Sequence, residues 1–156
     1  MGDKAPAGLA SDARGMRVVV LTASYNEAIV AGLLNGALAR WQELGGEAAA
    51  LRVERIPGAF ELPLAARQMA LAGGVDAVVA LGCVIRGDTA HFEYVAGECA
   101  RGLQNVMLET GLPVAFGVLT TENQAQAEAR SAPGADNKGA EAMDTAIAMV
   151  QLLRRI

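Results

Sequence analysis

Short apolar segments alternate with helix-length segments along this chain, and this alternation constrains the fold more than any other feature. Four apolar segments are predicted strands: RVVVLTA (17–23), AALRVERI (49–56), DAVVALGCVI (76–85) and PVAFGVLT (113–120). Five segments between and after them are predicted helices: 26–44, 60–72, 89–109, 122–130 and 137–155. Strands that alternate with helices in this way form parallel sheets covered on both faces. We therefore expect an α/β fold with a four-stranded parallel sheet.

The length of the chain sets its domain organisation. At 156 residues it is long enough for one domain with its own core, but short for two. We expect this domain to span residues 16–156. Residues 1–15 mix small, polar and charged residues without the apolar segment of a signal peptide, so we expect a tail that is flexible or docked on a partner.

The composition excludes several classes of protein. Apolar residues make up 53% of the chain, but no run approaches the roughly 18 apolar residues of a membrane span, so we expect no membrane association. The apolar excess instead favours burial between subunits. The net charge is −4 and no basic stripe is present, which argues against a nucleic-acid partner. Cys83 and Cys99 lack CxxC spacing, so we expect reduced thiols and a cytoplasmic location rather than a zinc site.

Ligands of parallel α/β sheets bind beyond the carboxyl ends of the strands, so the residues after each strand are candidates for the site. After the first strand, Ser24 or Asn26 can cap the next helix, while Tyr25 can stack on a planar ligand or simply lie at an amphipathic rim. After the second strand, the backbone N–H groups of residues 59–61 can bind oxygens. Glu61 can accept hydrogen bonds from hydroxyls or merely favour the helix dipole.

The third strand ends in GCVIRGDTAHFEYV, which contains the only histidine of the chain. A turn at Gly87 leads to Asp88 and Thr89, either of which can cap a helix that carries His91 in its first turn. A helix N-terminus with a hydroxyl is a natural anion site, and an imidazole beside it is suited to proton transfer. The alternative is a histidine that only caps or packs.

The fourth strand contains Phe116 and is followed by TTEN (120–123). Arg130 at the end of the next helix can bind a phosphate or can be a solvated residue near a helix C-terminus. Lys138 in DNKG (136–139) has the same two interpretations. No GxGxxG, Walker A, HExxH or GxSxG pattern occurs, so acid–base chemistry without a cofactor or metal remains.

Five motifs taken in order resemble the lumazine synthase family: SYNEAI, PGAFELP, GCVIRGDTAHFEYV, PVAFGVLTTEN and NKGAEA. The resemblance implies a flavodoxin-like three-layer α/β/α sandwich. It also implies a transferase of riboflavin biosynthesis that condenses 5-amino-6-(D-ribitylamino)uracil with 3,4-dihydroxy-2-butanone 4-phosphate and releases phosphate and water. Two alternatives are a riboflavin synthase of the same fold and a non-catalytic shell protein that binds lumazine or flavin.

The resemblance also assigns roles to individual residues. It implies that His91 transfers protons. It places a phosphate site at Gly87, Asp88, Thr89 and Arg130. It places the pyrimidine and ribityl chain at Tyr25, Asn26, Ala59, Phe60, Glu61, Cys83, Val84, Ile85, Phe116 and Lys138. Phe116, Arg130 and Lys138 match residues that the neighbouring subunit contributes, so the resemblance implies a homopentamer. The connection at 130–139 has no obvious insertion, which favours assembly of pentamers into a sixty-subunit shell, whereas its SAPGAD segment departs from the family pattern and leaves pentamers or decamers as alternatives. Riboflavin synthase is the expected protein partner.

Overall fold

The computed structural model describes residues 6, 8–10 and 12–156. The strands are β1 (Val18–Ala23), β2 (Leu51–Ile56), β3 (Ala77–Ile85) and β4 (Val114–Thr121). The α-helices are α1 (Glu27–Glu43), α2 (Leu62–Ala72), α3 (His91–Thr110), α4 (Gln124–Ser131) and α5 (Lys138–Arg155). Two short 3-10 helices, η1 (Ala48–Ala50) and η2 (Ala59–Glu61), precede β2 and α2.

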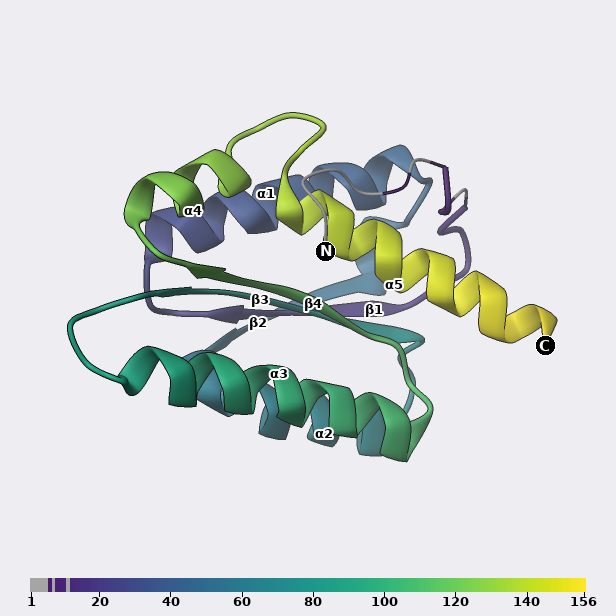
Figure 1. The fold of residues 1–156 in the computed structure, drawn as a ribbon. Coiled ribbons are helices and arrows are strands. Elements are labelled where there is room, and N and C mark those ends of the chain that lie inside the picture. The colour runs from purple at the N-terminus through teal and green to yellow at the C-terminus, as the bar shows by residue number, and fades with distance from the viewer. Residues whose placement is uncertain (1–5, 7, 11) are drawn as a thin grey trace.

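The four strands form one parallel sheet with the order β2-β1-β3-β4. Val18 of β1 pairs with Leu51 of β2 and with Ala77 of β3, so the three strands start at the same level. Helices α1, α4 and α5 cover one face of the sheet, and α2 and α3 cover the other (Figure 1). The structure thus confirms a flavodoxin-like three-layer α/β/α sandwich with a four-stranded parallel sheet.

Side chains of the strands alternate between two apolar cores, one on each face. Val18 and Val20 of β1 belong to the core beneath α1 and α5, while Val19 and Leu21 belong to the core beneath α2 and α3. Because both faces of β1 and β3 are buried, these two strands read as continuous apolar runs, whereas no residue of the edge strand β2 is fully buried.

All predicted helices and strands exist, and their bounds lie within two residues of the expected ones. The one difference in type is at residues 49–50, which were expected to begin β2 but lie in η1. None of the described helices is long and apolar enough to cross a membrane.

The expected N-terminal tail lies partly outside the described residues, because residues 1–5, 7 and 11 are not among them. Ala10 and Ala13 are buried in the core beneath α1 and α5. The backbone N–H of Ala13 donates a hydrogen bond to the carbonyl of Leu44 at 2.9 Å.

Candidate functional site

Asn26 connects the ends of two neighbouring strands at the carboxyl edge of the sheet. It has φ 56° and ψ 52°, the left-handed conformation that Asn tolerates better than most residues. Its side-chain Nδ2 donates to the carbonyl of Cys83 at 2.9 Å. Asn26 occupies the N-cap position of α1. The sequence suggested that its side chain caps this helix, but the side chain makes no capping hydrogen bond. The backbone carbonyl of Asn26 still accepts from the N–H groups of Ile29 and Val30.

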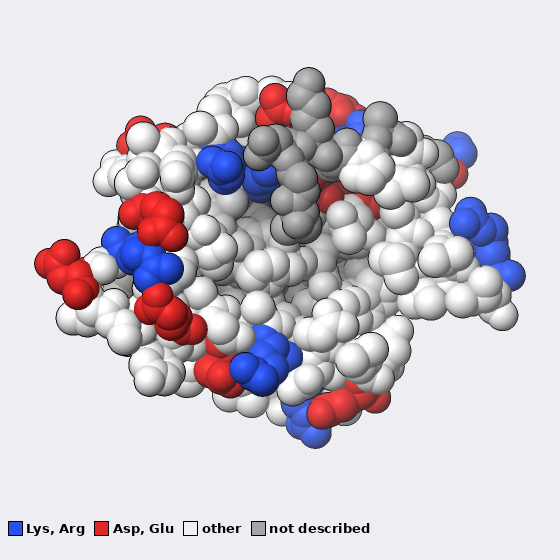
Figure 2. Space-filling model, in the orientation of Figure 1, with Lys and Arg blue, Asp and Glu red and all other residues white. Residues whose placement is uncertain are grey.

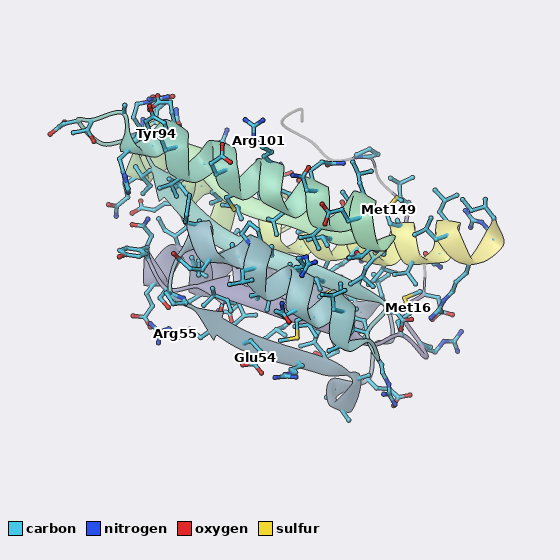
Figure 3. All side chains as sticks on the ribbon, turned by 90° about the horizontal axis from the view of Figure 1, so that it is seen from below. Met16, Glu54, Arg55, Tyr94, Arg101 and Met149 are labelled. Atoms are coloured by element: carbon cyan, nitrogen blue, oxygen red, sulfur yellow. The ribbon has the colours of Figure 1, made fainter. Side chains whose placement is uncertain are left out.

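Ser24 does not cap α1 either. Its hydroxyl donates to the carbonyl of Ile56 at 2.9 Å and accepts from Nε of Arg55 at the same distance. Arg55 also pairs with Glu27 of α1 at 3.3 Å. Figure 3 shows Arg55 near the end of β2. These contacts connect the ends of β1 and β2, and no local sequence pattern had indicated that Arg55 belongs to this edge.

The aromatic ring of Tyr25 and the carboxylate of Glu61 both lie close to Gly58. A Cβ atom at Gly58 would be 3.3 Å from Cε2 of Tyr25 and 3.0 Å from Oε2 of Glu61. Tyr25 is 73% exposed, and Phe60 in η2 is also exposed. Ala59 is buried and anchors η2 in the core beneath α2 and α3. The edge thus presents an aromatic face and a carboxylate side by side, which suits a planar ring with hydroxyl donors.

Residues 83–85 form the end of β3, between β1 and β4. The side chain of Cys83 is buried in the core beneath α1 and α5, and burial raises the pKa of its thiol to about 11. A neutral, buried thiol is a poor nucleophile. Cys83 therefore contributes its backbone to the edge of the sheet rather than its sulfur. Val84 and Ile85 are only partly buried.

A wide loop beyond the strand ends connects β3 to α3 (Figure 1). Residues 87–90 are exposed, and the N-cap position of α3 is Ala90 rather than Asp88 or Thr89. The hydroxyl of Thr89 accepts a hydrogen bond from the backbone N–H of His91 at 3.4 Å. His91 is the first residue of α3 and is exposed. The loop thus presents an imidazole at a helix N-terminus, where backbone N–H groups favour anions.

Phe116 lies away from the strand ends of its own chain. It pairs with Ala80 of β3, whereas Cys83 pairs with Leu119. At about 3.3 Å per residue, Phe116 is roughly 10 Å short of Cys83 along the strand direction. Its partly buried ring packs against the core beneath α2 and α3.

Arg130 and Lys138 lie on the opposite face of the sheet from α3. Arg130 is near the end of α4 and donates from a guanidinium nitrogen to the carbonyl of Gln126 at 3.0 Å. Lys138 is the first residue of α5, and its ammonium donates to both carboxylate oxygens of Glu141 at 2.7 and 2.9 Å. The Lys138 and Glu141 side chains are each 17% exposed. Among the described residues no hydrogen bond or ion pair joins His91 to Arg130, and the helices that carry them, α3 and α4, cover different faces of the sheet (Figure 1).

A buried asparagine holds the α4–α5 connection that separates Arg130 from Lys138. Asn137 is 2% exposed, and its Nδ2 donates to the carbonyls of Gly32, Ser131 and Ala132 at 2.9–3.1 Å. Its Oδ1 caps α5 by accepting from the N–H groups of Gly139 and Ala140. We call Asn137 with these hydrogen bonds the Asn137 clamp.

Two parts of a site result from this geometry. The first, which we call the strand-end group, lies at or after the carboxyl ends of β1, β2 and β3 at one edge of the sheet: Tyr25, Asn26, Ala59, Phe60, Glu61, Cys83, Val84, Ile85, Gly87, Asp88, Thr89 and His91. The second, which we call the far group, consists of Phe116, Arg130 and Lys138, which lie on β4, α4 and α5. The strand-end group offers ring stacking, a carboxylate, an imidazole and a helix N-terminus. The two cations of the far group, Arg130 and Lys138, are not part of the strand-end group.

Comparisons with known proteins extend over nearly the whole chain. A family model described as 6,7-dimethyl-8-ribityllumazine synthase matches residues 15–154. A Thermus thermophilus protein named 6,7-dimethyl-8-ribityllumazine synthase is 51% identical over 144 residues, which cover 92% of each chain. A Syntrophus aciditrophicus protein of the same name is 48% identical over 144 residues, which cover 92% of this chain and 94% of the relative.

Proposed function

The chain belongs to the 6,7-dimethyl-8-ribityllumazine synthase family, and we propose that it condenses 5-amino-6-(D-ribitylamino)uracil with 3,4-dihydroxy-2-butanone 4-phosphate. The products are 6,7-dimethyl-8-ribityllumazine, phosphate and water. The enzyme is thus a transferase of riboflavin biosynthesis with small-molecule substrates. One observation carries the proposal: Tyr25, Glu61 and His91 follow three neighbouring strands at the same edge of the sheet.

The strand-end group binds the pyrimidine substrate in this proposal. The ring of Tyr25 stacks on the pyrimidine, and Glu61 accepts hydrogen bonds from ribityl hydroxyls. Asn26, Ala59, Phe60 and the backbone of residues 83–85 complete this part of the site. The exposure of Tyr25 and Phe60 supports these roles, because both rings are accessible to a ligand.

The reaction requires a proton transfer at nearly every step. A ring amine attacks the ketone, the carbinolamine loses water, phosphate leaves by elimination, and the second amine closes the ring with loss of water. His91 moves protons between these intermediates, while residues 87–89 and Arg130 hold the phosphate. Holding the two substrates in a fixed relative orientation supplies much of the rate enhancement.

We place Arg130, Phe116 and Lys138 of one chain in the site of a neighbouring copy. The separation of the strand-end group from the far group within one chain supports this arrangement. The β4 edge also supports it, because β4 carries no charged residue. The face of the molecule along this edge shows few charged side chains and a hollow in its middle (Figure 2).

Head-to-tail contacts of this kind close into rings, and we propose a homopentamer. Exposed apolar residues on the outer helix layer support burial between copies: Leu64 and Leu71 on α2, and Tyr94 and Leu108 on α3. We further propose that the rings assemble into a sixty-subunit shell and that the shell associates with riboflavin synthase. We place the protein in the cytoplasm. The two buried free thiols fit a reducing compartment.

The direct test incubates the purified chain with both substrates and follows lumazine formation and phosphate release. Equal amounts of lumazine and phosphate are expected. His91→Ala is expected to lower turnover by about tenfold to a hundredfold while both substrates still bind. Absence of lumazine with the unmodified chain would refute the activity, and full turnover of His91→Ala at every pH would refute the role of His91.

The placement of Arg130 has its own test. Arg130→Ala is expected to weaken binding of the phosphorylated ketone by roughly tenfold or more, because a charged hydrogen-bond partner is lost. Inorganic phosphate is expected to compete with the same substrate in the unmodified protein. A defect that affects only the pyrimidine substrate would contradict this placement.

A further inference from the structure

The side chain of Arg86, the first residue after β3, contacts three residues in two other segments of the strand-end edge. Its Nε donates to Oε2 of Glu122 at 2.7 Å, directly after β4. A second guanidinium nitrogen donates to Oε1 of Glu93 in the first turn of α3. The guanidinium also lies 4.3 Å from the centre of the Phe92 ring, within the range of a cation–π contact.

The backbone of Arg86 is fixed as well, because its N–H donates to the carbonyl of Thr121 at 2.9 Å. The side chain of Arg86 therefore extends from a backbone that is hydrogen-bonded to the end of β4. Basic and acidic side chains gather beyond the strand ends, at the left of Figure 2. We call Arg86 with Glu93, Glu122 and the Phe92 ring the Arg86 bridge.

The loop that the bridge spans has little other support. Residues 87–90 are exposed, and a Cβ at Gly87 would meet no atom within 4 Å. Hydrogen bonds within this stretch are local, from His91 N–H to Thr89 and from Glu93 N–H to the carbonyl of Ala90. Phe92 and Glu93 directly follow His91, so contacts to them also restrain the backbone that carries the imidazole.

We propose that Arg86 is a positioning residue for His91, which it holds against the ends of β3 and β4 through Glu93, Phe92 and Glu122. The proposal rests on the proton-transfer role given to His91 above. Arg86 is not assigned to the substrate or to the reacting atoms. It acts by fixing where the first turn of α3, and with it the imidazole, lies relative to the sheet.

The contribution of the bridge is local rather than global. The side chains of Arg86, Glu93 and Glu122 are 37%, 52% and 61% exposed. Ion pairs this exposed contribute little to overall stability. Loss of Arg86 is therefore expected to leave the chain folded and to loosen only the first turn of α3.

The first experiment measures hydrogen exchange by mass spectrometry in unmodified protein and in Arg86→Gln. Several-fold faster exchange is expected in peptides that cover residues 87–97, with unchanged exchange in the sheet. Arg154→Gln is the matched control, because Arg154 forms an exposed 3.1 Å ion pair with Asp76, just before β3 at the other end of the strand. This control should leave residues 87–97 unchanged. Unchanged exchange in Arg86→Gln would overturn the proposal.

The second experiment is a double-mutant cycle on turnover. Arg86→Gln is expected to lower kcat by roughly tenfold when His91 is present, since misplacing a proton-transfer group forfeits much of its effect. The same substitution should change kcat less than about twofold in His91→Ala, because the group that it positions is already absent. Equal losses in both backgrounds would overturn the proposal.

The two experiments also separate this inference from the proposed function. If the unmodified chain formed no lumazine, the proposed function would fail. Hydrogen exchange would still decide whether Arg86 holds the first turn of α3.

Discussion

Two connections position the proposed catalytic groups, and they are held in opposite ways. The α4–α5 connection, which carries Arg130 and Lys138 at its ends, is fixed by the buried and neutral Asn137 clamp. The β3–α3 connection, which ends at His91, is fixed by the exposed and charged Arg86 bridge. The first should be insensitive to salt and pH, while the second should respond to both.

The difference matches the two proposed tasks. Arg130, which holds the leaving phosphate together with residues 87–89, benefits from a fixed position, because binding and orientation are all that it supplies. An imidazole that serves several successive proton transfers must face more than one intermediate. An exposed restraint with a small contribution to stability leaves such a group positioned but adjustable.

The largest expected effect is at the clamp. Asn137→Ala removes the cap of α5 and leaves one buried and two partly buried carbonyls without their donor, so the free energy of unfolding should fall by about 3–5 kcal/mol. Urea denaturation at one fixed protein concentration measures this change. Asn123→Ala is the control, because Asn123 caps α4 through a single exposed hydrogen bond. Its loss should cost about 1 kcal/mol, and equal losses at the two caps would contradict the comparison.

A smaller loss is expected from crowding the clamp while its hydrogen-bonding groups remain. A Cβ at Gly36 would overlap the side chain of Asn137, so Gly36→Ala should force α1 away from the α4–α5 connection. Overpacking of this kind costs about 1–3 kcal/mol. Gly97→Ala on α3 is the control, because a Cβ there meets no atom of the chain within 4 Å. A decrease of the denaturation midpoint in Gly97→Ala as large as in Gly36→Ala would argue against close packing at the clamp, because Ala in an open helix position normally stabilises the helix.

The smallest effect is a local dependence on pH. The Arg86 guanidinium lowers the pKa of Glu93 below its ordinary value of 4.5. A carboxylate with a lowered folded-state pKa stabilises the folded first turn above that ordinary value, and the contribution disappears as the pH falls through the lower one. Hydrogen exchange in residues 87–97, corrected for intrinsic rates, should therefore accelerate as the pH falls from about 6 to about 3.5.

The clamp provides the internal reference for this measurement. The Gly139 and Ala140 amides donate to the neutral side chain of Asn137, so their exchange should not follow the titration of Glu93. In Arg86→Gln the acceleration at residues 87–97 should be smaller. An identical pH profile in unmodified protein and in Arg86→Gln would show that the bridge does not restrain the turn.

The sequence predicted the order and extent of the elements well, because continuous apolar strands and 3.6-residue helical periodicity are local signals. It did not predict the partners of polar side chains. Ser24, Asn26 and Thr89 were expected at helix caps, but the side chains of Ser24 and Asn26 bond to neighbouring strand ends. These partners lie 32 and 57 residues away, and local patterns carry no information about such pairs.

The Arg86 bridge and the Asn137 clamp were not predicted for the same reason. The sequence did contain a signal for the bridge. Arg86 and Glu122 each lie within two residues of the end of a predicted strand, and the ends of neighbouring parallel strands lie at the same edge of a sheet. For the clamp, Gly32 and Gly36 of α1 indicate a close approach to another element, but their spacing does not identify it. The roles of the individual site residues remain predictions, and the division between the strand-end group and the far group suggests how to test them together.

The most direct test of the central claim, that each site takes its two groups from different copies, mixes two impaired chains that each lack one of the groups. His91→Ala and Arg130→Ala chains are co-expressed with different tags, and native mass spectrometry establishes that mixed assemblies form. If sites are shared, random mixing leaves about one site in four with both groups intact, so activity should rise to about a quarter of that of the unmodified protein. Activity no greater than the average of the two parent variants, in assemblies shown to be mixed, would mean that His91 and Arg130 act within one chain.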